Sequence, residues 1–473
     1  MQKVNFDCIC LKSLFEHLYS FLNPSFKIVF IFVRIQKTLP FYMIIDPAAD
    51  ITKRNLVVSE MAETLISSEI IKLAGEINDK IKAGEHIFNF TIGDFDPAIF
   101  PIPQELQDAI ITAYKEGRTN YPAANGIAEL RATISRFLDK RENLHYHPEE
   151  ILVAGGARPL IYAAYQTLVS PGDTVIFPTP SWNNNHYCHL SGAKAIAIET
   201  KPENNFMPTA AELRPHLKGA RLLSLCSPLN PTGTVFTKKD LEEICDLVIE
   251  ENNRRTPAEK PLYLLYDQIY WVLTFGETCH YNPISLRPEL RDYTIFIDGL
   301  SKAFAATGVR VGWSFGPAHI IDRMKSILSH IGAWAPKAEQ HASAVYMNED
   351  EKVDTFLVKF KKNVHDRLEA FYKGFKELKK EGFKINVIAP QAAIYLTVQF
   401  DLHGMKTPKG KRIETTKDIT TYILEEAKLA IVPFSAFGSA ENSCWYRLSV
   451  GTASMIEIGE VFLKLREALK KLS

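Results

Sequence analysis

Short apolar runs rich in β-branched and aromatic residues recur along the middle of the chain, separated by stretches with helical spacing. They predict strands at residues 151–155, 174–177, 193–199, 221–226, 262–267, 293–298 and 311–316. Strands that alternate with helices and are apolar on both faces belong to sheets that are covered on both sides. The pattern therefore predicts an α/β fold with a mainly parallel sheet sandwiched by helices.

A different arrangement is predicted beyond this region. Residues 351–381 carry phenylalanine, leucine and valine at helical spacing among many charges, which indicates one long amphipathic helix. Two further strands, at 394–400 and 446–450, and helices from Thr416 and Met455 follow it. This part of the chain predicts a smaller α+β domain.

The length of 473 residues exceeds what a single growing core supports, so more than one domain is expected. We expect residues 101–345 to form the large domain and 346–473 the small C-terminal domain, which the segment 59–100 joins. Residues 1–58 are predicted to be an extension outside the fold, with Met43 or Met61 as a possible true start. The apolar run within this extension is far shorter than the roughly 18 to 20 residues of a membrane span, so no membrane association is expected.

The charge balance and the cysteine content exclude some classes of function. Lys+Arg and Asp+Glu both number 55, so the net charge is 0 and no basic footprint for nucleic acid is expected. The seven cysteines form no CxxC pair. They indicate free thiols in a reducing compartment, which predicts a cytoplasmic location and no metal site.

Three short segments at predicted strand ends carry chemistry. VAGGARPL (153–160) places two glycines between a strand and a helix, where backbone N–H groups can surround an anion. SPLNPTG (227–233) presents the amide of Asn230, and YDQIY (266–270) presents the carboxylate of Asp267. Each segment alone could equally be a turn or a helix cap.

Two further segments carry cations. GLSKAFAATGVRVG (299–312) places Lys302 after an apolar strand among small residues, where an amine is desolvated and becomes nucleophilic. Arg310 follows at a spacing suited to a dianion. YRLSVGT (446–452) places Arg447 in an apolar strand, and a buried arginine needs an anionic partner. That partner is either a protein carboxylate or a substrate carboxylate.

In content and in order, these five segments resemble the class I and II aminotransferases of the aspartate-aminotransferase fold, from about Ser59 to the C-terminus. The segment around Lys302 is similar to the family's cofactor-lysine signature at every constrained position. The resemblance implies a pyridoxal 5'-phosphate enzyme. It would move an amino group from an L-amino acid to a 2-oxo acid such as 2-oxoglutarate.

The resemblance also implies roles around the cofactor ring. Lys302 would form the Schiff base with the cofactor aldehyde and act as the acid and base of the proton transfer. Asp267 would pair with the pyridine nitrogen, while Asn230 and Tyr270 would bond the phenolic oxygen. Trp182 would stack on the ring.

Further roles concern the phosphate and the substrate. The resemblance assigns the phosphate to backbone groups of Gly156 and Ala157 and to the side chain of Arg310. It adds Tyr121 from a second subunit, which requires a homodimer with shared active sites. The substrate carboxylate would bind Arg447, assisted by Gly93 and Asn230.

The chain departs from the family pattern at three places. Gly299 stands where many relatives have a phosphate-binding serine, so Ser301 or Arg158 would have to replace that contact. Gln268 stands where glutamate commonly follows the ring aspartate. AAIY at 392–395 replaces a usual Gly-Ala-Phe-Tyr.

Two other functions fit the same residues. A Cβ–S lyase would expel a β-substituent from the same carbanion. A non-catalytic cofactor sensor would need a DNA-binding module, yet the region before Ser59 has no basic helix-turn-helix pattern. The amino donor stays open, and Arg118 and Arg158 are the two candidates for a second cation that would select dicarboxylates.

Overall fold

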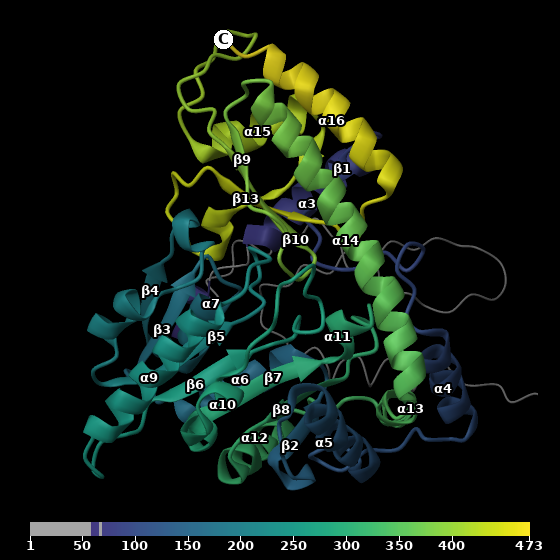
Figure 1. The fold of residues 1–473 in the computed structure, drawn as a ribbon, viewed down its shortest axis with the longest axis vertical. Helices are drawn as coiled ribbons and strands as arrows, with labels where there is room; N and C mark the ends of the chain where they lie inside the picture. The colour runs from purple at the N-terminus through teal and green to yellow at the C-terminus, as the bar shows by residue number, and fades with distance from the viewer. Residues whose placement is uncertain (1–57, 66–68) are drawn as a thin grey trace, which may run out of the picture. The chain divides into compact units, whose positions relative to one another are not determined.

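The computed structural model describes residues 58–65 and 69–473, so the predicted N-terminal extension lies outside the described residues (Figure 1). Residues Ser59–Ser473 form one compact unit. Among the described helices, none is long and apolar enough to cross a membrane.

A seven-stranded sheet forms the centre of the larger part of the molecule (Figure 1). The strands are, in spatial order, β2 (Ile151–Ala154), β8 (Gly312–Phe315), β7 (Thr294–Gly299), β6 (Tyr263–Asp267), β5 (Ala220–Cys226), β3 (Thr174–Thr179) and β4 (Lys194–Glu199). All seven predicted strands are confirmed. Neighbouring strands from β7 to β4 run parallel, whereas β8 is antiparallel to both β2 and β7.

Alternate side chains of the central strands enter two apolar layers, as the period of two requires. In β5, for example, Leu222 faces one core and Leu223 the other. The first core is completed by α6 (Ala157–Leu168) and α12 (Ala318–His330), and the second by α5 (Ala128–Glu142) and α9 (Lys238–Arg254). Helices on both faces explain why these strands are apolar throughout.

The smaller part contains two short sheets. An antiparallel sheet has the order β12 (Val432–Pro433), β13 (Trp445–Ser449), β10 (Tyr395–Phe400) and β9 (Ile385–Val387). Beside it, β1 (Phe88–Asn89) pairs in parallel with β11 (Leu429–Ala430), so a segment from the N-terminal side joins the C-terminal part. Four of these strands, β1, β9, β11 and β12, are two or three residues long, too short for a sequence period.

One long helix, α14 (Asp350–Lys380), runs from the larger part to the smaller one (Figure 1). It confirms the predicted amphipathic helix, and the helices predicted from Thr416 and Met455 are α15 (Thr416–Glu426) and α16 (Met455–Lys470). We propose the domain division 59–100, 101–345 and 346–473, in which the last boundary lies close to the start of α14. The other helices are α2 (Glu60–Thr64), α3 (Glu69–Lys82), α4 (Gln104–Lys115), α7 (Asn184–Ser191), α8 (Ala210–Leu213), α10 (Pro283–Leu286), α11 (Leu300–Ala303) and α13 (Lys337–Met347).

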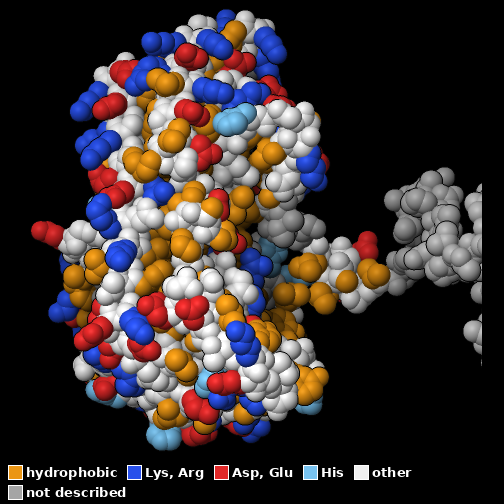
Figure 2. Space-filling view, turned by 90° about the vertical axis from the view of Figure 1, so that its right-hand side faces the viewer, with side chains coloured by type: hydrophobic (Ala, Val, Ile, Leu, Met, Phe, Trp, Pro, Cys, Tyr) orange, Lys and Arg blue, Asp and Glu red, His pale blue; other side chains and the backbone are white. Residues whose placement is uncertain are grey.

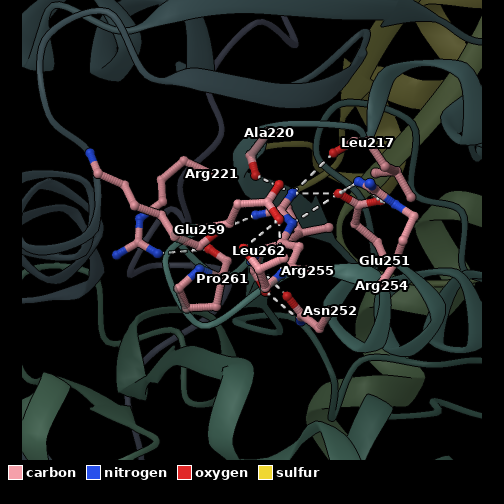
Figure 3. A network of polar contacts seen from close by, with 12 residues as sticks. Leu217, Ala220, Arg221, Glu251, Asn252, Arg254, Arg255, Glu259, Pro261 and Leu262 are labelled. Atoms are coloured by element: carbon pink, nitrogen blue, oxygen red, sulfur yellow. Dashed lines mark hydrogen bonds and ion pairs between the residues drawn. The ribbon is translucent and has the colours of Figure 1, made fainter.

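A buried polar network fixes the starting ends of β5 and β6 to the end of α9 (Figure 3). Arg255 donates to the carbonyl oxygens of Leu217 and Ala220, at 3.1 and 2.7 Å, and pairs with Glu251 at 2.8 Å. Asn252 exchanges two hydrogen bonds with the backbone of Leu262. Because this network holds the starting ends of β5 and β6, the carboxyl ends of the two strands are fixed in position at the opposite end of the sheet.

Charges of both signs are interspersed on the face drawn in Figure 2. This mixture agrees with the net charge of 0. On that face, lysine and arginine side chains do not gather into an extended basic surface of the kind that binds nucleic acid.

Candidate active site

A cavity of about 620 Å³ lies at the carboxyl ends of β5 and β6. Open α/β sheets bind their ligands at such ends. Strands β10 and β13 of the smaller sheet contribute Tyr395 and Arg447 to its wall, and α3 contributes Ile70 and Ala74. Nine of the eleven residues assigned from sequence line it: Gly93, Ala157, Trp182, Asn230, Asp267, Tyr270, Lys302, Arg310 and Arg447.

Lys302 projects into this cavity from α11, which directly follows β7. Its Nζ donates a hydrogen bond of 2.6 Å to the carbonyl oxygen of Gly93. Burial lowers the pKa of Lys302 to about 8, and the charges of Arg447, Arg158 and Arg310 also lower it. Roughly a tenth of this amine is therefore neutral at pH 7, against less than about a thousandth for an ordinary lysine, and the neutral form can act as a nucleophile and a base.

Asp267 is the last residue of β6. Its Oδ1 accepts a hydrogen bond of 3.0 Å from the backbone N–H of Ile269. Burial raises the pKa of this carboxyl to about 6. No arginine or lysine in the described part of the chain forms an ion pair with it, so Asp267 can pair with a cation brought by a ligand.

An anion cradle lies at the N-terminus of α6. Gly156 precedes this helix with φ of 96°, and a Cβ on it would lie only 2.1 Å from Nη2 of Arg310. Arg310 also donates to the carbonyl oxygens of Thr307 and Gly155, at 2.6 and 2.9 Å. The free N–H groups of the helix end and this guanidinium together favour a dianion such as phosphate.

Two tyrosines lie opposite each other in the wall of the cavity. The hydroxyl oxygens of Tyr270 and Tyr395 are 2.7 Å apart. Burial raises the pKa of both groups, so both stay protonated and can donate a hydrogen bond.

Arg447 is buried and lies between two aromatic rings. Its guanidinium carbon is 4.7 Å from the ring centre of Tyr395 and 4.8 Å from that of Phe437. Nη1 donates to Oδ1 of Asn230 at 3.0 Å and Nη2 donates to the carbonyl oxygen of Thr91 at 2.6 Å. Its Nε has no partner among the described residues.

No protein carboxylate pairs with Arg447 within the described residues, and burial lowers the pKa of its guanidinium. This geometry argues against the structural salt bridge. A buried guanidinium without an anion suits a carboxylate that arrives with a ligand.

Trp182 and Arg158 form another side of the cavity. The guanidinium carbon of Arg158 lies 5.1 Å from the ring centre of Trp182, which is a cation–π distance. Ser301 also lines the cavity, so both residues expected to replace a missing serine at position 299 are present there.

The packing around Gly299 explains that departure. A Cβ at this position would lie 2.8 Å from Cα of Gly312 and 3.0 Å from the carbonyl oxygen of Val311. Strands β7 and β8 therefore approach too closely here for a side chain.

Tyr121 and Arg118 lie outside this cavity. Tyr121 is 81% exposed, and its ring centre is 5.2 Å from that of Trp334. Arg118 pairs with Glu116 at 2.9 Å. Both residues line a separate surface hollow with Trp334, so neither contacts the cavity of its own chain.

Several residues of the cavity were not assigned from sequence. Tyr395 was noted only as part of a departure, although its strand was predicted. Asp94 accepts a hydrogen bond of 2.6 Å from Thr307 and raises the pKa of Lys302 against the effect of burial. The sequence signal for Asp94 is its position next to Gly93.

One described group of side chains has the geometry of a metal site, namely Asp401, His403 and Cys444. None of the three lines the cavity. The chemistry of the cavity itself depends on cations, carboxylates and hydroxyls.

The cavity fits pyridoxal 5'-phosphate. It offers a cradle for a dianion, a buried carboxylate without a cation, and a lysine whose pKa is lowered. These are the partners needed by a phosphate, a ring nitrogen and an aldehyde. Fold and cavity together define an enzyme that holds such a cofactor at the carboxyl ends of a mainly parallel sheet.

Comparisons with known proteins agree. Residues 85–459 match the family model of aminotransferase class I and II. A bifunctional aspartate aminotransferase and glutamate/aspartate-prephenate aminotransferase from Petunia hybrida is 30% identical over 430 residues, covering 90% of this chain and 86% of that protein. The crystal structure of the aspartate aminotransferase from Rhizobium meliloti has a TM-score of 0.80 at 27% identity, covering 88% of this chain and 100% of that one.

An aromatic aminotransferase from Pyrococcus horikoshii is similar as well, with a TM-score of 0.72 and 27% identity over 83% of this chain and 98% of that one. The chain belongs to the class I and II aminotransferases. It is a pyridoxal-phosphate-dependent enzyme that moves an amino group between an amino acid and a 2-oxo acid.

Proposed function

We propose that this cavity carries out amino-group transfer with the residue roles expected from the sequence. The observation that carries the proposal is the meeting of Lys302, Asp267 and Arg447 in one cavity. Each of the three is charged or nucleophilic, and none of them forms an ion pair with another of the described residues.

When bound, the cofactor supplies an aldehyde that bonds to amines and a ring that accepts the electron pair released at the substrate Cα. Gly156, Ala157 and Arg310 would hold its phosphate, with Asp267 at the ring nitrogen. Asn230 and Tyr270 would donate to its phenolic oxygen, and Trp182 would cover the ring.

The substrate is held and deprotonated by two side chains. Arg447 binds its carboxylate, with Asn230 and the backbone of Gly93 beside it. Lys302, oriented by the Gly93 carbonyl, would take the Cα proton on Nζ and then deliver it to the carbon that the cofactor aldehyde supplies. The second half-reaction would move a proton in the opposite direction through the same amine, so one residue serves both.

We infer a homodimer with shared active sites. Tyr121 is exposed and lies outside the cavity of its own chain, which supports a role in the cavity of a second copy. The five described cysteines are free thiols, which supports a cytoplasmic location.

The substrate panel that tests the function uses several amino acids as donors, with 2-oxoglutarate as acceptor. The relatives' names point to aspartate and aromatic amino acids as donors for this panel; glutamate, which one name also gives, would only exchange with 2-oxoglutarate. We expect glutamate to form together with the donor's 2-oxo acid and little ammonia. Formation of ammonia and pyruvate from a β-substituted donor, without glutamate, would instead establish the Cβ–S lyase.

A pH dependence follows from the lowered pKa of Lys302. The cofactor bonds only to the neutral amine, and that form increases as the pH rises through about 8. The rate at which the cofactor-free enzyme bonds its cofactor should therefore rise with pH and level off above about 8. A rate that keeps rising toward pH 10, where ordinary lysines of pKa about 10.4 titrate, would contradict the lowered pKa.

Arg447→Lys keeps the charge but removes the planar fork that binds a carboxylate with two parallel hydrogen bonds. Loss of one charge-assisted hydrogen bond of about 1.5 to 3 kcal/mol predicts a KM for the amino acid that rises roughly 10- to 100-fold. The absorbance of the bound cofactor should not change. An unchanged KM in a folded variant would exclude Arg447 as the carboxylate site.

A further inference from the structure

A closed group of polar side chains lies behind Asp267, away from the cavity. It consists of Glu142 at the end of α5, Gln268 directly after Asp267, and three residues that surround them: Trp271, His280 and Asp298. None of the five lines the cavity. Gln268 and Asp298 are buried, and the side chains of Glu142 and His280 are only 3% and 7% exposed.

Gln268 links the group. Its Nε2 donates to both carboxyl oxygens of Glu142, at 2.8 and 2.9 Å. Its backbone N–H donates to the carbonyl oxygen of Ile297 at 3.0 Å, which fixes the residue against β7. Its Oε1 is buried and accepts no hydrogen bond within the described part of the chain. A donor is therefore missing at this oxygen.

Asp298 is held by two donors. Its Oδ1 accepts from the backbone N–H of Gly299 at 2.7 Å, and its Oδ2 accepts from Nε1 of Trp271 at 3.0 Å. The pKa of Asp298 is raised to about 8, mainly by burial and to a smaller extent by the charge of Asp267, against the hydrogen bonds from Gly299 and Trp271.

Glu142 has a similar environment. Burial and the charge of Asp298 raise its pKa well above the usual range, against the hydrogen bond from Gln268. Its nearest basic neighbour is His280, whose Nε2 lies 3.9 Å away. Burial lowers the pKa of His280 to about 3, so the ring is neutral, and neither ring nitrogen has a hydrogen-bond partner among the described residues.

The other titratable groups that face the cluster add no charge. The hydroxyl of Tyr266 donates to the carbonyl oxygen of Tyr281 at 2.7 Å, and the thiol of Cys226 lies beside Asp267. Burial raises the pKa of both groups. On α5, Arg141 pairs with Asp354 at 2.8 Å instead.

Three carboxyl groups thus share a volume without an arginine or lysine partner among the described residues. Adjacent carboxylates cannot all ionise, and an unpaired buried charge is strongly unfavourable. Asp267 faces the cavity, where a ligand can supply a cation, whereas Asp298 and Glu142 face only protein.

We propose that Asp298 and Glu142 are positioning residues held as neutral acids and linked through Gln268, so that Asp267 is the one carboxylate of this group that ionises. Protonated Asp298 donates to the free Oε1 of Gln268. The hydroxyl of protonated Glu142 would face the ring of His280, whose nitrogens have no other partner among the described residues. The proposal rests on the proposed role of Asp267, because it explains how one negative charge is kept at the ring nitrogen.

Infrared spectroscopy of the purified holoenzyme tests the protonation directly. Protonated carboxyl groups have a carbonyl band that ionised ones lack and that shifts in heavy water. We expect this band at pH 7, and we expect Asp298→Asn and Glu142→Gln each to remove one component. In the unmodified enzyme, the component of Asp298 should decrease as the pH rises through about 8. Absence of the band in the active, unmodified enzyme would overturn the proposal.

An exchange of substitutions tests the link. Gln268→Glu places a further carboxyl beside Glu142 and should lower the thermal unfolding temperature, increasingly so as the pH rises and the added acid ionises. Gln268→Glu combined with Glu142→Gln exchanges the two groups and should restore both the unfolding temperature and its pH dependence. If the double variant is no better than the single one, the pair does not act as a unit.

These measurements separate this proposal from the proposed function. If the infrared components are present but no amino acid is transaminated, the assigned reaction is wrong and the neutral acids stand. If transamination is normal and the components are absent, the reaction stands and the neutral acids are wrong.

Discussion

Lys302→Ala is expected to reduce amino-group transfer by at least about a thousandfold. General acid–base catalysis alone contributes roughly 100- to 10,000-fold, and the substitution also removes the amine that bonds to the cofactor. The phosphate cradle of Gly156 and Arg310 is untouched, so the cofactor should still bind noncovalently. Stopped-flow measurement of a single half-reaction would determine the loss.

Lys325→Ala is a matched control for this variant. Lys325 lies on α12, where it pairs with Asp322 near the surface, and it contributes nothing to the cavity. Its rate should equal that of the unmodified enzyme. A Lys302→Ala enzyme that keeps most of its rate would contradict the assigned base.

Asp267→Asn is expected to lower kcat by roughly 100- to 1000-fold, the usual loss when a preorganised electrostatic group at a reacting centre is removed. The asparagine keeps the shape of the side chain but no longer holds a positive charge at the ring nitrogen. Since the phosphate cradle is unchanged, most of the cofactor should stay bound at saturating concentration.

Asp267→Glu provides the comparison, because it keeps the charge and displaces it by one methylene group. Its kcat should lie between those of Asp267→Asn and the unmodified enzyme. Near-normal turnover of Asp267→Asn would refute the role of this carboxylate.

Much of the large sheet could be predicted from sequence because its strands are buried on both faces and follow one another in βα order. The antiparallel direction of β8 could not be predicted, since an apolar strand has the same residue pattern in either direction. The strands β1 and β11 were missed because two residues have no measurable period. Their pairing depends on a contact between the N-terminal and C-terminal parts.

Site residues could be predicted from sequence where a charged side chain follows or lies within an apolar strand, because few structural roles explain a charge at such a position. Lys302, Asp267 and Arg447 come from three separate segments, and the fold brings them into one cavity. Tyr395 was not assigned a role, because its hydroxyl acquires one only through its 2.7 Å contact with Tyr270, 125 residues away.

The buried acids behind Asp267 illustrate the same limit. Gln268 was noticed only as a departure from a family pattern, and Glu142 lies in a charged helix end that reads as surface. Their meaning depends on the hydrogen bonds between them, which span 126 residues. Sequence spacing carries no signal for such a contact.

The central claim is that Lys302 bonds to the cofactor, and chemical trapping tests it most directly. Borohydride reduces the bond between a lysine and pyridoxal phosphate, so the reduced holoenzyme can be digested and the labelled peptide sequenced. The account predicts one labelled residue, Lys302, within GLSKAFAATGVRVG. A label on another lysine, or no label on an enzyme that binds the cofactor and is active, would contradict it.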